Sequence, residues 1–377
     1  MTTIAVIGLG TMGLGIAQTY AAAGFAVLAT DAAPDARETA LERLRAGLAR
    51  RVQAGKLAQS ELEAILARIT LADGAEAMGR ADLAIEAVVE RMEVKRALFA
   101  ALESVLAPDA VLASNTSSLS VAAMAEGLSQ PQRLLGLHFF NPAPVMKLVE
   151  LVAHSGTSAA ALERARRLTE AAGKTVIPCP DRPGFIVNRC ARPFYGEALA
   201  LLEEGRSAGE IDAAMLAAGY PLGPFGLIDL VGADINLAAT ESLAAAMQNH
   251  PRYHVFDALK RQVAQDDLGR KTGRGFLFPD KPGPAPADAQ AIVLRIEAAL
   301  VNEAGWLLAE GGTTPEDIDT ALKLGLNFPR GPFEILAAQG RGPVLARLQR
   351  LSAAAPAHLQ GRYRPSPVLA MPRPGSP

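Results

Sequence analysis

The chain begins with a short apolar run, residues 4–7, that leads directly into three glycines at a fixed spacing. The turn consists of Gly8, Leu9, Gly10, Thr11, Met12 and Gly13. A buried strand followed by G-x-G-x-x-G is typical of a dinucleotide-binding turn. The first glycine permits a sharp bend, the second leaves room for a pyrophosphate, and the third lets a helix pack closely on the strand. The N-terminus of that helix then faces the phosphates.

A second apolar run, residues 25–30, ends in an acidic residue, Asp31, at about the twenty-residue separation that this turn requires. A carboxylate at this place accepts hydrogen bonds from a ribose 2′-hydroxyl and repels a 2′-phosphate. Ala32 and Ala33 follow it, and no arginine is adjacent. The pattern therefore favours NAD over NADP. A tight strand-to-helix turn without a nucleotide is the alternative, and it leaves Asp31 unexplained.

Length and composition are compatible with a compact enzyme of two or three domains. Half of the 377 residues are hydrophobic and the net charge is −2, so no nucleic-acid partner is indicated. Cys179 and Cys190 lack metal-ligand spacing and suit a reducing compartment. No signal peptide precedes the first strand, and no apolar run approaches the roughly 18 residues of a membrane span. We therefore expect a cytoplasmic protein with no metal and no membrane partner.

Further apolar segments alternate with helical patterns. Strands are expected at residues 81–88, 111–113, 134–140 and 145–152, with a helix from about Val94 to a stop at Pro108. Such alternation predicts an α/β domain of Rossmann type with a doubly wound, mainly parallel sheet. Ligands of these sheets bind at the carboxyl ends of the strands.

The segment from Pro34 to Ile69 is longer than an ordinary crossover and has the periodicity of two helices, so we expect a helical hairpin inserted beside the sheet. It is locally basic, with Arg43, Arg45, Arg50, Arg51 and Lys56. These charges are either a solvated helix face or a site for a phosphorylated ligand.

Polar residues follow two of the expected strands at the ligand edge, in residues 114–118 and 138–142. A proline turn joins the strand that ends near His138 to the one that contains Glu150, so the two side chains can meet. An imidazole that acts as a base needs one fixed tautomer and a group that stabilises its protonated form, and a carboxylate supplies both. We interpret the pair as catalytic. A structural histidine is the alternative.

Five segments together carry a family resemblance. They are residues 114–118 (SNTSS), 136–150 (GLHFFNPAPVMKLVE), 183–189 (PGFIVNR), 219–225 (GYPLGPF) and 271–276 (KTGRGF). In this order and spacing, from residue 3 to about residue 280, the chain resembles the L-3-hydroxyacyl-CoA dehydrogenase family. The resemblance implies NAD-dependent oxidation of a 3-hydroxyacyl-CoA and a place in fatty-acid metabolism such as β-oxidation. It leaves acyl chain length and pathway open.

The resemblance also assigns roles to residues. His138 is the general base that takes the proton of the 3-hydroxyl group, and Glu150 supports it. Ser117 hydrogen-bonds the substrate oxygen, and Asn188 helps to hold the acyl group. The positions that line the NAD site are Glu90, Lys95, Asn115, Asn141 and Lys271. On the hairpin, Gly47 and Ala54 stand where the family contacts coenzyme A, so Arg50, Arg51 or Lys56 would have to bind the acyl-CoA instead.

Two classes of alternative remain. The architecture also resembles NAD-dependent dehydrogenases of gulonate or carnitine, which act on other hydroxy acids. A catalytically silent NAD-binding protein would bind NADH and turn over nothing. A Ser–His hydrolase is not favoured, because Ser117 lies outside a G-x-S-x-G elbow and a hydrolase has no use for the glycine turn.

After Pro183 the pattern becomes helical and contains a repeat. Residues 197–202 match 303–308, 211–212 match 318–319, and 223–225 match 331–333, at offsets that grow from 106 to 108. We therefore expect an NAD-binding domain over 1–181, two all-α domains in tandem over 182–280 and 287–352, and a proline-rich tail over 353–377. The second copy is interpreted as a covalent substitute for a dimer mate, with additional scaffold as the alternative. Either a monomer or a homodimer fits.

Overall fold

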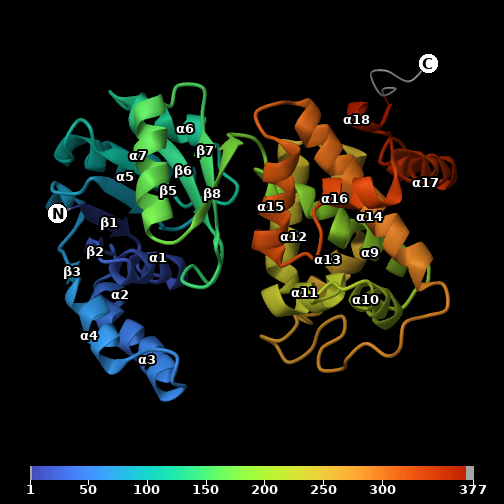
Figure 1. Ribbon diagram of the computed structural model, residues 1–377, viewed down its shortest axis with the longest axis horizontal. Coiled ribbons are helices and arrows are strands. Elements are labelled where there is room, and N and C mark those ends of the chain that lie inside the picture. Colours follow the sequence, from blue (N-terminus) through green and yellow to red (C-terminus); the bar gives the residue numbers. More distant parts are fainter. Residues whose placement is uncertain (1, 371–377) are drawn as a thin grey trace. The chain divides into compact units, whose positions relative to one another are not determined.

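The computed structural model describes residues 2–370. By the contacts between their residues, these fall into two compact units that divide between Phe185 and Ile186. The N-terminal unit contains the sheet and the C-terminal unit is helical (Figure 1). This agrees with the expected order of an α/β domain followed by all-α structure. The two helical copies form one compact unit rather than two separate ones.

One eight-stranded sheet forms the centre of the N-terminal unit, in the order β3-β2-β1-β4-β5-β6-β7-β8. All neighbouring strands are parallel except β6 and β7. The strands are β1 (Thr3–Ile7), β2 (Ala26–Thr30), β3 (Ile69–Leu71), β4 (Leu83–Glu86), β5 (Val111–Ser114), β6 (Leu134–Phe139), β7 (Leu148–Ala153) and β8 (Thr175–Pro180). The mainly parallel sheet that the sequence predicts is thus confirmed.

Helices follow most of these strands. They are α1 (Thr11–Ala22), α2 (Pro34–Glu38), α3 (Ala40–Gln53), α4 (Gln59–Ala67), α5 (Met92–Val105), α6 (Val121–Ala125) and α7 (Ala159–Ala171), with short 3-10 turns at Ala75–Met78 and Pro131–Arg133. Helices α3 and α4 pack on each other as the expected hairpin, which extends away from the sheet (Figure 1).

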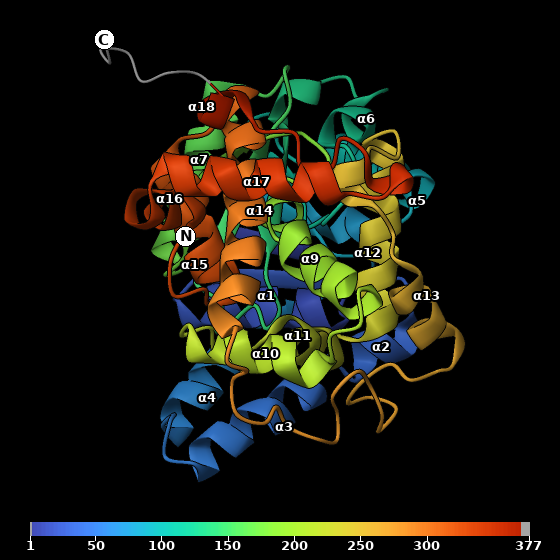
Figure 2. The same cartoon turned by 90° about the vertical axis from the view of Figure 1, so that its right-hand side faces the viewer.

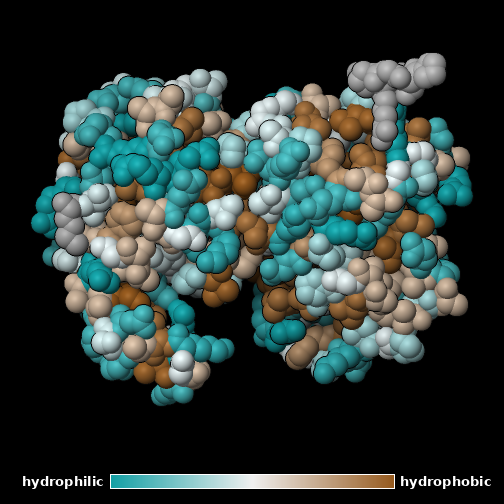
Figure 3. All heavy atoms as spheres, viewed as in Figure 1, coloured by the Kyte–Doolittle hydropathy of each residue, from teal (hydrophilic) through white to brown (hydrophobic). Residues whose placement is uncertain are grey.

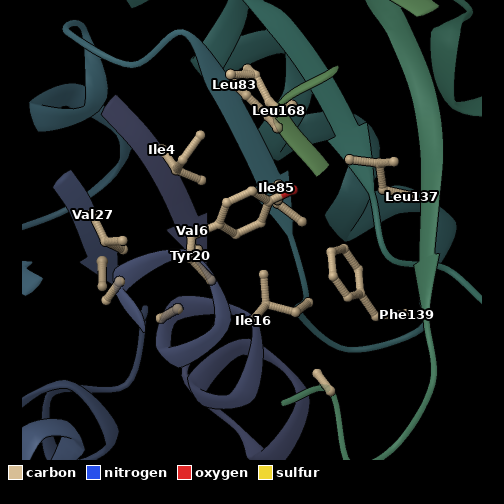
Figure 4. Close-up of a cluster of buried hydrophobic side chains, with 14 of the residues drawn as sticks. Ile4, Val6, Ile16, Tyr20, Val27, Leu83, Ile85, Leu137, Phe139 and Leu168 are labelled. Atoms are coloured by element: carbon tan, nitrogen blue, oxygen red, sulfur yellow. The ribbon is translucent and has the colours of Figure 1, made fainter. Parts of the chain in front are cut away.

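Alternating residues of the strands build the core of this unit. Ile4 and Val6 of β1 and Ile85 of β4 point to one face, where Ile16 and Tyr20 of α1 cover them (Figure 4). The residues between them, such as Ala5 and Ala84, are also fully buried. Both faces of the sheet are therefore covered, as in a doubly wound fold.

Three details differ from the sequence-based expectation. Ile69 was expected at the end of the second hairpin helix, but it begins β3, which pairs with β2. Residues 145–147 belong to a turn, and β7 begins only at Leu148. Lys174 fixes that turn by donating to the carbonyl oxygens of Ala143 at 2.5 Å and Met146 at 2.8 Å. Strand β8 was not expected.

The C-terminal unit consists of two copies of a helical motif. Its helices are α8 (Val187–Cys190), α9 (Arg192–Glu203), α10 (Ala208–Ala217), α11 (Pro224–Val231), α12 (Ala233–Ala246), α13 (Asp257–Ala264), α14 (Ala289–Ala309), α15 (Pro315–Leu326), α16 (Pro332–Gln339), α17 (Arg341–Ala354) and α18 (Pro367–Ala370), with 3-10 turns at Pro251–Tyr253 and Ala357–Leu359. The order α9 to α12 recurs as α14 to α17, and Figure 2 shows these helices within the unit.

A reciprocal set of ion pairs joins the two copies. Arg189 binds Glu303 at 2.8 Å and Glu310 at 2.6 Å. By the repeat offset of 106, the corresponding residues are Arg295, Glu197 and Glu204, and Arg295 binds these two acids at 2.9 and 2.6 Å. In a two-fold interface each contact occurs twice, with the roles of the two copies exchanged. The copies therefore pack with approximate two-fold symmetry.

The segment after α17 takes part in the same interface. Arg362 and Tyr363 are 5% and 3% exposed, and both bind Glu197, at 2.8 and 3.0 Å. In the first copy Arg252 and Tyr253 bind Glu303 in the same way. The segment 353–370, for which the sequence predicts a proline-rich tail, thus contacts the helical unit through Arg362 and Tyr363. Residues 371–377 of that expected tail lie outside the described residues.

Candidate active site

The glycine turn has the geometry that a bound dinucleotide requires. Gly8 has a φ of +98°, and a Cβ atom there would lie 2.5 Å from the carbonyl oxygen of Ala87. A Cβ on Gly13 would lie 1.7 Å from the carbonyl oxygen of Gly8. A Cβ on Gly10 would meet nothing within 4 Å, so this glycine faces open space at the N-terminus of α1. The turn thus offers a cradle that a side chain would fill, and the dinucleotide fits the residues present.

Asp31 lies beside this turn, at the end of β2. Its Oδ2 accepts a hydrogen bond from the Leu9 N–H at 2.6 Å, and its Oδ1 accepts one from the Ala33 N–H at 2.8 Å. Two arginines that the sequence analysis did not connect with the site lie close by. Arg37 donates to the carbonyl oxygen of Asp31 at 3.3 Å, and Arg43 of the hairpin donates to that of Leu9 at 3.0 Å.

His138 and Glu150 face each other across the one antiparallel strand pair, as expected. They are direct partners in the register of β6 and β7, and His138 Nδ1 lies 2.6 Å from Glu150 Oε2. Glu150 is fully buried and His138 is 6% exposed. The rings of Phe140 and Phe185 lie 4.5 and 5.7 Å from the imidazole. The apolar surroundings strengthen the electrostatic interaction between the two side chains.

A second acidic group, Glu86, occupies the carboxyl end of β4 and was read from the sequence only as a strand residue. It is fully buried, accepts hydrogen bonds from Lys95 Nζ and Ser114 Oγ at 2.6 Å each, and binds the Val88 N–H at 2.7 Å. Lys95, 1% exposed, also binds Glu90 at 3.1 Å. The Glu86 carboxylate therefore joins the ends of β4 and β5, and the ammonium group of Lys95 joins Glu86 to Glu90 in the loop that follows β4.

Glu90 fixes the serine-rich loop. Its Oε1 accepts hydrogen bonds from Thr116 Oγ1 at 2.6 Å and from the Ser117 N–H at 3.0 Å. Burial alone would raise the pKa of Glu90, but the charge of Lys95 and these hydrogen bonds outweigh it and hold the pKa below its usual value. Asn115, in the same loop, accepts from the Phe139 N–H at 2.9 Å, which ties the loop to β6 beside His138.

The other expected site residues have different surroundings. Asn141 is exposed in the turn after β6. Asn188 lies on α8, and its carbonyl oxygen accepts from Arg192 at 3.0 Å. Lys271, in the loop after α13, forms an ion pair with Asp234 at 2.5 Å. Asn188 and Lys271 belong to the helical unit.

The basic residues of the hairpin differ in their pairing. Arg45 is held by Glu63 at 2.7 Å. Arg50, Arg51 and Lys56, near the outer end of α3, are exposed to solvent. In Figure 3 hydrophilic residues gather at this end of the hairpin, while hydrophobic ones lie along its middle. Within residues 2–370 no helix is long and apolar enough to cross a membrane, and no group of three or more His, Cys, Asp or Glu could hold a metal ion.

Comparison with known proteins identifies the family of the chain. The model of the "3-hydroxyacyl-CoA dehydrogenase, NAD binding domain" matches residues 3–182, and that of the "3-hydroxyacyl-CoA dehydrogenase, C-terminal domain" matches residues 184–278 and 292–372. The chain is 35% identical to 3-hydroxyadipyl-CoA dehydrogenase of Escherichia coli, over 97% of this chain and 96% of that protein.

Two further relatives support the assignment. A probable 3-hydroxybutyryl-CoA dehydrogenase of Bacillus subtilis is 40% identical over 72% of this chain and 96% of its own length. The crystal structure of 3-hydroxybutyryl-CoA dehydrogenase from E. coli superposes with a TM-score of 0.90 at 34% identity, over 98% of this chain and 97% of that one. The N-terminal unit is therefore an NAD-binding domain, and the chain belongs to the 3-hydroxyacyl-CoA dehydrogenase family.

Proposed function

We propose that this protein catalyses the reversible, NAD-dependent oxidation of an L-3-hydroxyacyl-CoA to the 3-oxoacyl-CoA. The observation that carries the proposal is the 2.6 Å hydrogen bond between His138 and Glu150, in the NAD-binding unit and at the strand edge that also carries the glycine turn. The two relatives described above, which are named 3-hydroxyadipyl-CoA and probable 3-hydroxybutyryl-CoA dehydrogenase, support the substrate class.

In the proposed mechanism His138 is the general base. Its Nδ1 is engaged by Glu150, so Nε2 is the atom that takes the proton of the substrate 3-hydroxyl group. Glu150 keeps the proton on Nδ1 and stabilises the imidazolium that forms. Bound NAD supplies the acceptor for the hydride that leaves C3. In the reverse direction His138 returns the proton to the carbonyl oxygen.

The loop held by Glu90 positions the reacting oxygen. We assign Ser117 as the donor to that oxygen and Asn188 as a residue that holds the acyl group. Because Glu90 fixes the backbone at Ser117 and Asn115 binds the backbone of β6, the donor and the base are carried by connected elements. Such connections limit the relative movement of reacting groups, which is how positioning lowers a barrier. Lys95, Asn141 and Lys271 are proposed to line the NAD site.

Coenzyme A is proposed to bind the hairpin through Arg51 and Lys56, with Arg50 beside them. These side chains are exposed, so they can reach phosphate groups without giving up a buried ion pair. Arg43 connects the same hairpin to the carbonyl oxygen of Leu9 in the glycine turn.

We further infer that the second helical copy takes the place of a dimer mate. The reciprocal pairing of Arg189 with Glu303, and of Arg295 with Glu197, supports this inference, because a homodimer of single copies would form such contacts between chains. Sedimentation should then give the mass of one chain. A stable dimer would refute the substitution.

The test of the catalytic proposal is a substrate panel followed through the absorbance of NADH. Acetoacetyl-CoA should be reduced with NADH, and L-3-hydroxybutyryl-CoA oxidised with NAD, while gulonate and carnitine are not turned over. Oxidation of gulonate or carnitine without activity on any acyl-CoA would reassign the substrate. Binding of NADH without turnover of any member would show a silent protein.

A further inference from the structure

The approximate two-fold symmetry of the helical unit does not extend to every side chain, and one pair of positions differs greatly in size. Helix α14 carries Trp306, and the corresponding residue of α9, 106 positions earlier, is Ala200. The neighbouring pairs keep the symmetry: Glu197 corresponds to Glu303 and Glu204 to Glu310, all in ion pairs across the interface. Equivalent positions of α9 and α14 therefore carry a methyl group in one copy and an indole in the other.

The indole ring of Trp306 makes two specific contacts. The guanidinium group of Arg252 lies 4.6 Å from the centre of the indole ring, and the indole N–H donates to the carbonyl oxygen of Arg364 at 3.3 Å. A cation over the face of the ring and a hydrogen bond from the ring N–H are contacts by which proteins hold a flat aromatic group.

At Ala200 there is a cavity of about 380 Å³ instead. Its walls belong to the helical unit alone, and they combine apolar groups, such as Phe256 and Leu351, with the polar side chains of Glu203 and His358. The volume lies within the range of about 300–1,000 Å³ that is typical of small-molecule sites. A wall of mainly apolar groups with a few polar ones is also typical of such sites.

The charge of the cavity wall favours a cationic ligand. Its one cationic guanidinium group, that of Arg295, is already bound by Glu197 and by Glu204, which also lines the cavity. Glu203 is exposed and uses its Oε1 to accept the Ala258 N–H at 2.8 Å. A carboxylate with remaining acceptor positions beside an apolar wall suits an ammonium group.

We propose that this cavity is a binding site for a small arylalkylamine, whose ring takes the place that corresponds to Trp306 in the other copy and whose ammonium group binds Glu203. The site is built wholly from the helical unit and shares no residue with the NAD turn or with His138 and Glu150. Its occupation is therefore a separate function from the dehydrogenase reaction.

The experiment is calorimetric titration of the full chain, saturated with NAD, with tryptamine as the probe. We expect one molecule bound per chain, and at least tenfold weaker binding of indole-3-propionate, which has a similar ring and side chain but the opposite charge. Ala200→Trp should abolish tryptamine binding while NADH affinity and turnover of acetoacetyl-CoA remain those of the parent protein.

Trp306→Ala supplies the matched variant, because it opens the equivalent space in the second copy. The position that corresponds to Glu203 is Ala309, and the guanidinium group of Arg252 lies over the place of the indole. The proposal therefore predicts that this variant still binds one tryptamine per chain, and that the double variant with Ala200→Trp binds none. Should Trp306→Ala fail to fold, Ala200→Trp alone decides the matter. The proposal is wrong if the parent protein does not bind tryptamine, if Ala200→Trp binds it unchanged, or if the anionic analogue binds as tightly.

Discussion

Replacement of Glu150 by glutamine tests the central pair of the proposed mechanism. The amide keeps the shape and an oxygen acceptor for the His138 Nδ1–H, so the tautomer is retained and only the negative charge is lost. With the contacting atoms at 2.6 Å, the two charge centres lie about 4 Å apart, and at an effective dielectric constant of about 20 their attraction is about 4 kcal/mol. Since about 1.4 kcal/mol is a factor of ten, kcat should fall about 10³-fold.

The assay is the oxidation of L-3-hydroxybutyryl-CoA with NAD, the direction in which the imidazolium forms, followed through NADH absorbance, together with NADH affinity from fluorescence. We expect NADH to bind Glu150→Gln nearly as it binds the parent protein, because the change concerns the protonated state of His138 and not the glycine turn. Glu163→Gln, an exposed glutamate on α7, is the matched control and should keep full activity. A decrease in kcat of less than about tenfold, about 1.4 kcal/mol, would refute the role assigned to Glu150.

Three further substitutions test other parts of the molecule. Asp31→Asn, which keeps an acceptor for the Leu9 N–H, should narrow the preference for NAD over NADP about tenfold in kcat/KM, because it removes one charged hydrogen bond to the ribose. Replacing both Arg51 and Lys56 by alanine should raise KM for acyl-CoA about five- to twentyfold with kcat unchanged. Added salt should remove this difference in KM between the variant and the parent protein, because it screens the charges. Arg295→Met should lower the free energy of unfolding by about 3–5 kcal/mol in urea titration, since Glu197 loses one of its two cations.

Each of these substitutions has a control and a contrary result. An unchanged cofactor ratio would show that Asp31 does not contact the ribose. Arg45→Ala should leave KM for acyl-CoA unchanged, because Arg45 is bound by Glu63. If replacing Arg51 and Lys56 also leaves KM unchanged, these residues of the hairpin do not bind coenzyme A. Arg206→Met disrupts an exposed pair with Asp288 and should cost less than about 1 kcal/mol; an equal loss for both arginine variants would contradict the burial argument.

Sequence alone identified the features that depend on local spacing. The glycine turn and Asp31 follow from two short segments, and the approach of His138 to Glu150 follows from two strands joined by a short turn. Glu86 was missed because an acid inside an apolar strand can lie on either a buried or a solvated face. Its role depends on Lys95 and Ser114, which come from other elements of the sheet.

Long-range pairing accounts for the other differences. Ile69 fits the period of the preceding helix, and only pairing with β2 draws it into a strand. Arg362 and Tyr363 lie in a proline-rich segment that suggested a surface tail, although the same Arg-Tyr doublet occurs at positions 252 and 253. That doublet was the available signal. Its role depends on buried acids at least 50 positions away in the chain, which no local pattern contains.

The exchanged arginine and glutamate contacts place a constraint on how this gene can change. A charge lost from α9 removes one acidic partner of a buried arginine in the other copy, so a tolerated substitution on one helix demands a compensating one far along the same chain. After a duplication, one copy can ordinarily accumulate substitutions independently of the other. Here each copy supplies buried charges that pair with the other copy, so substitutions at these positions are coupled. Divergence is then confined to positions outside that network, and Ala200, which corresponds to Trp306 in the other copy, is one such position.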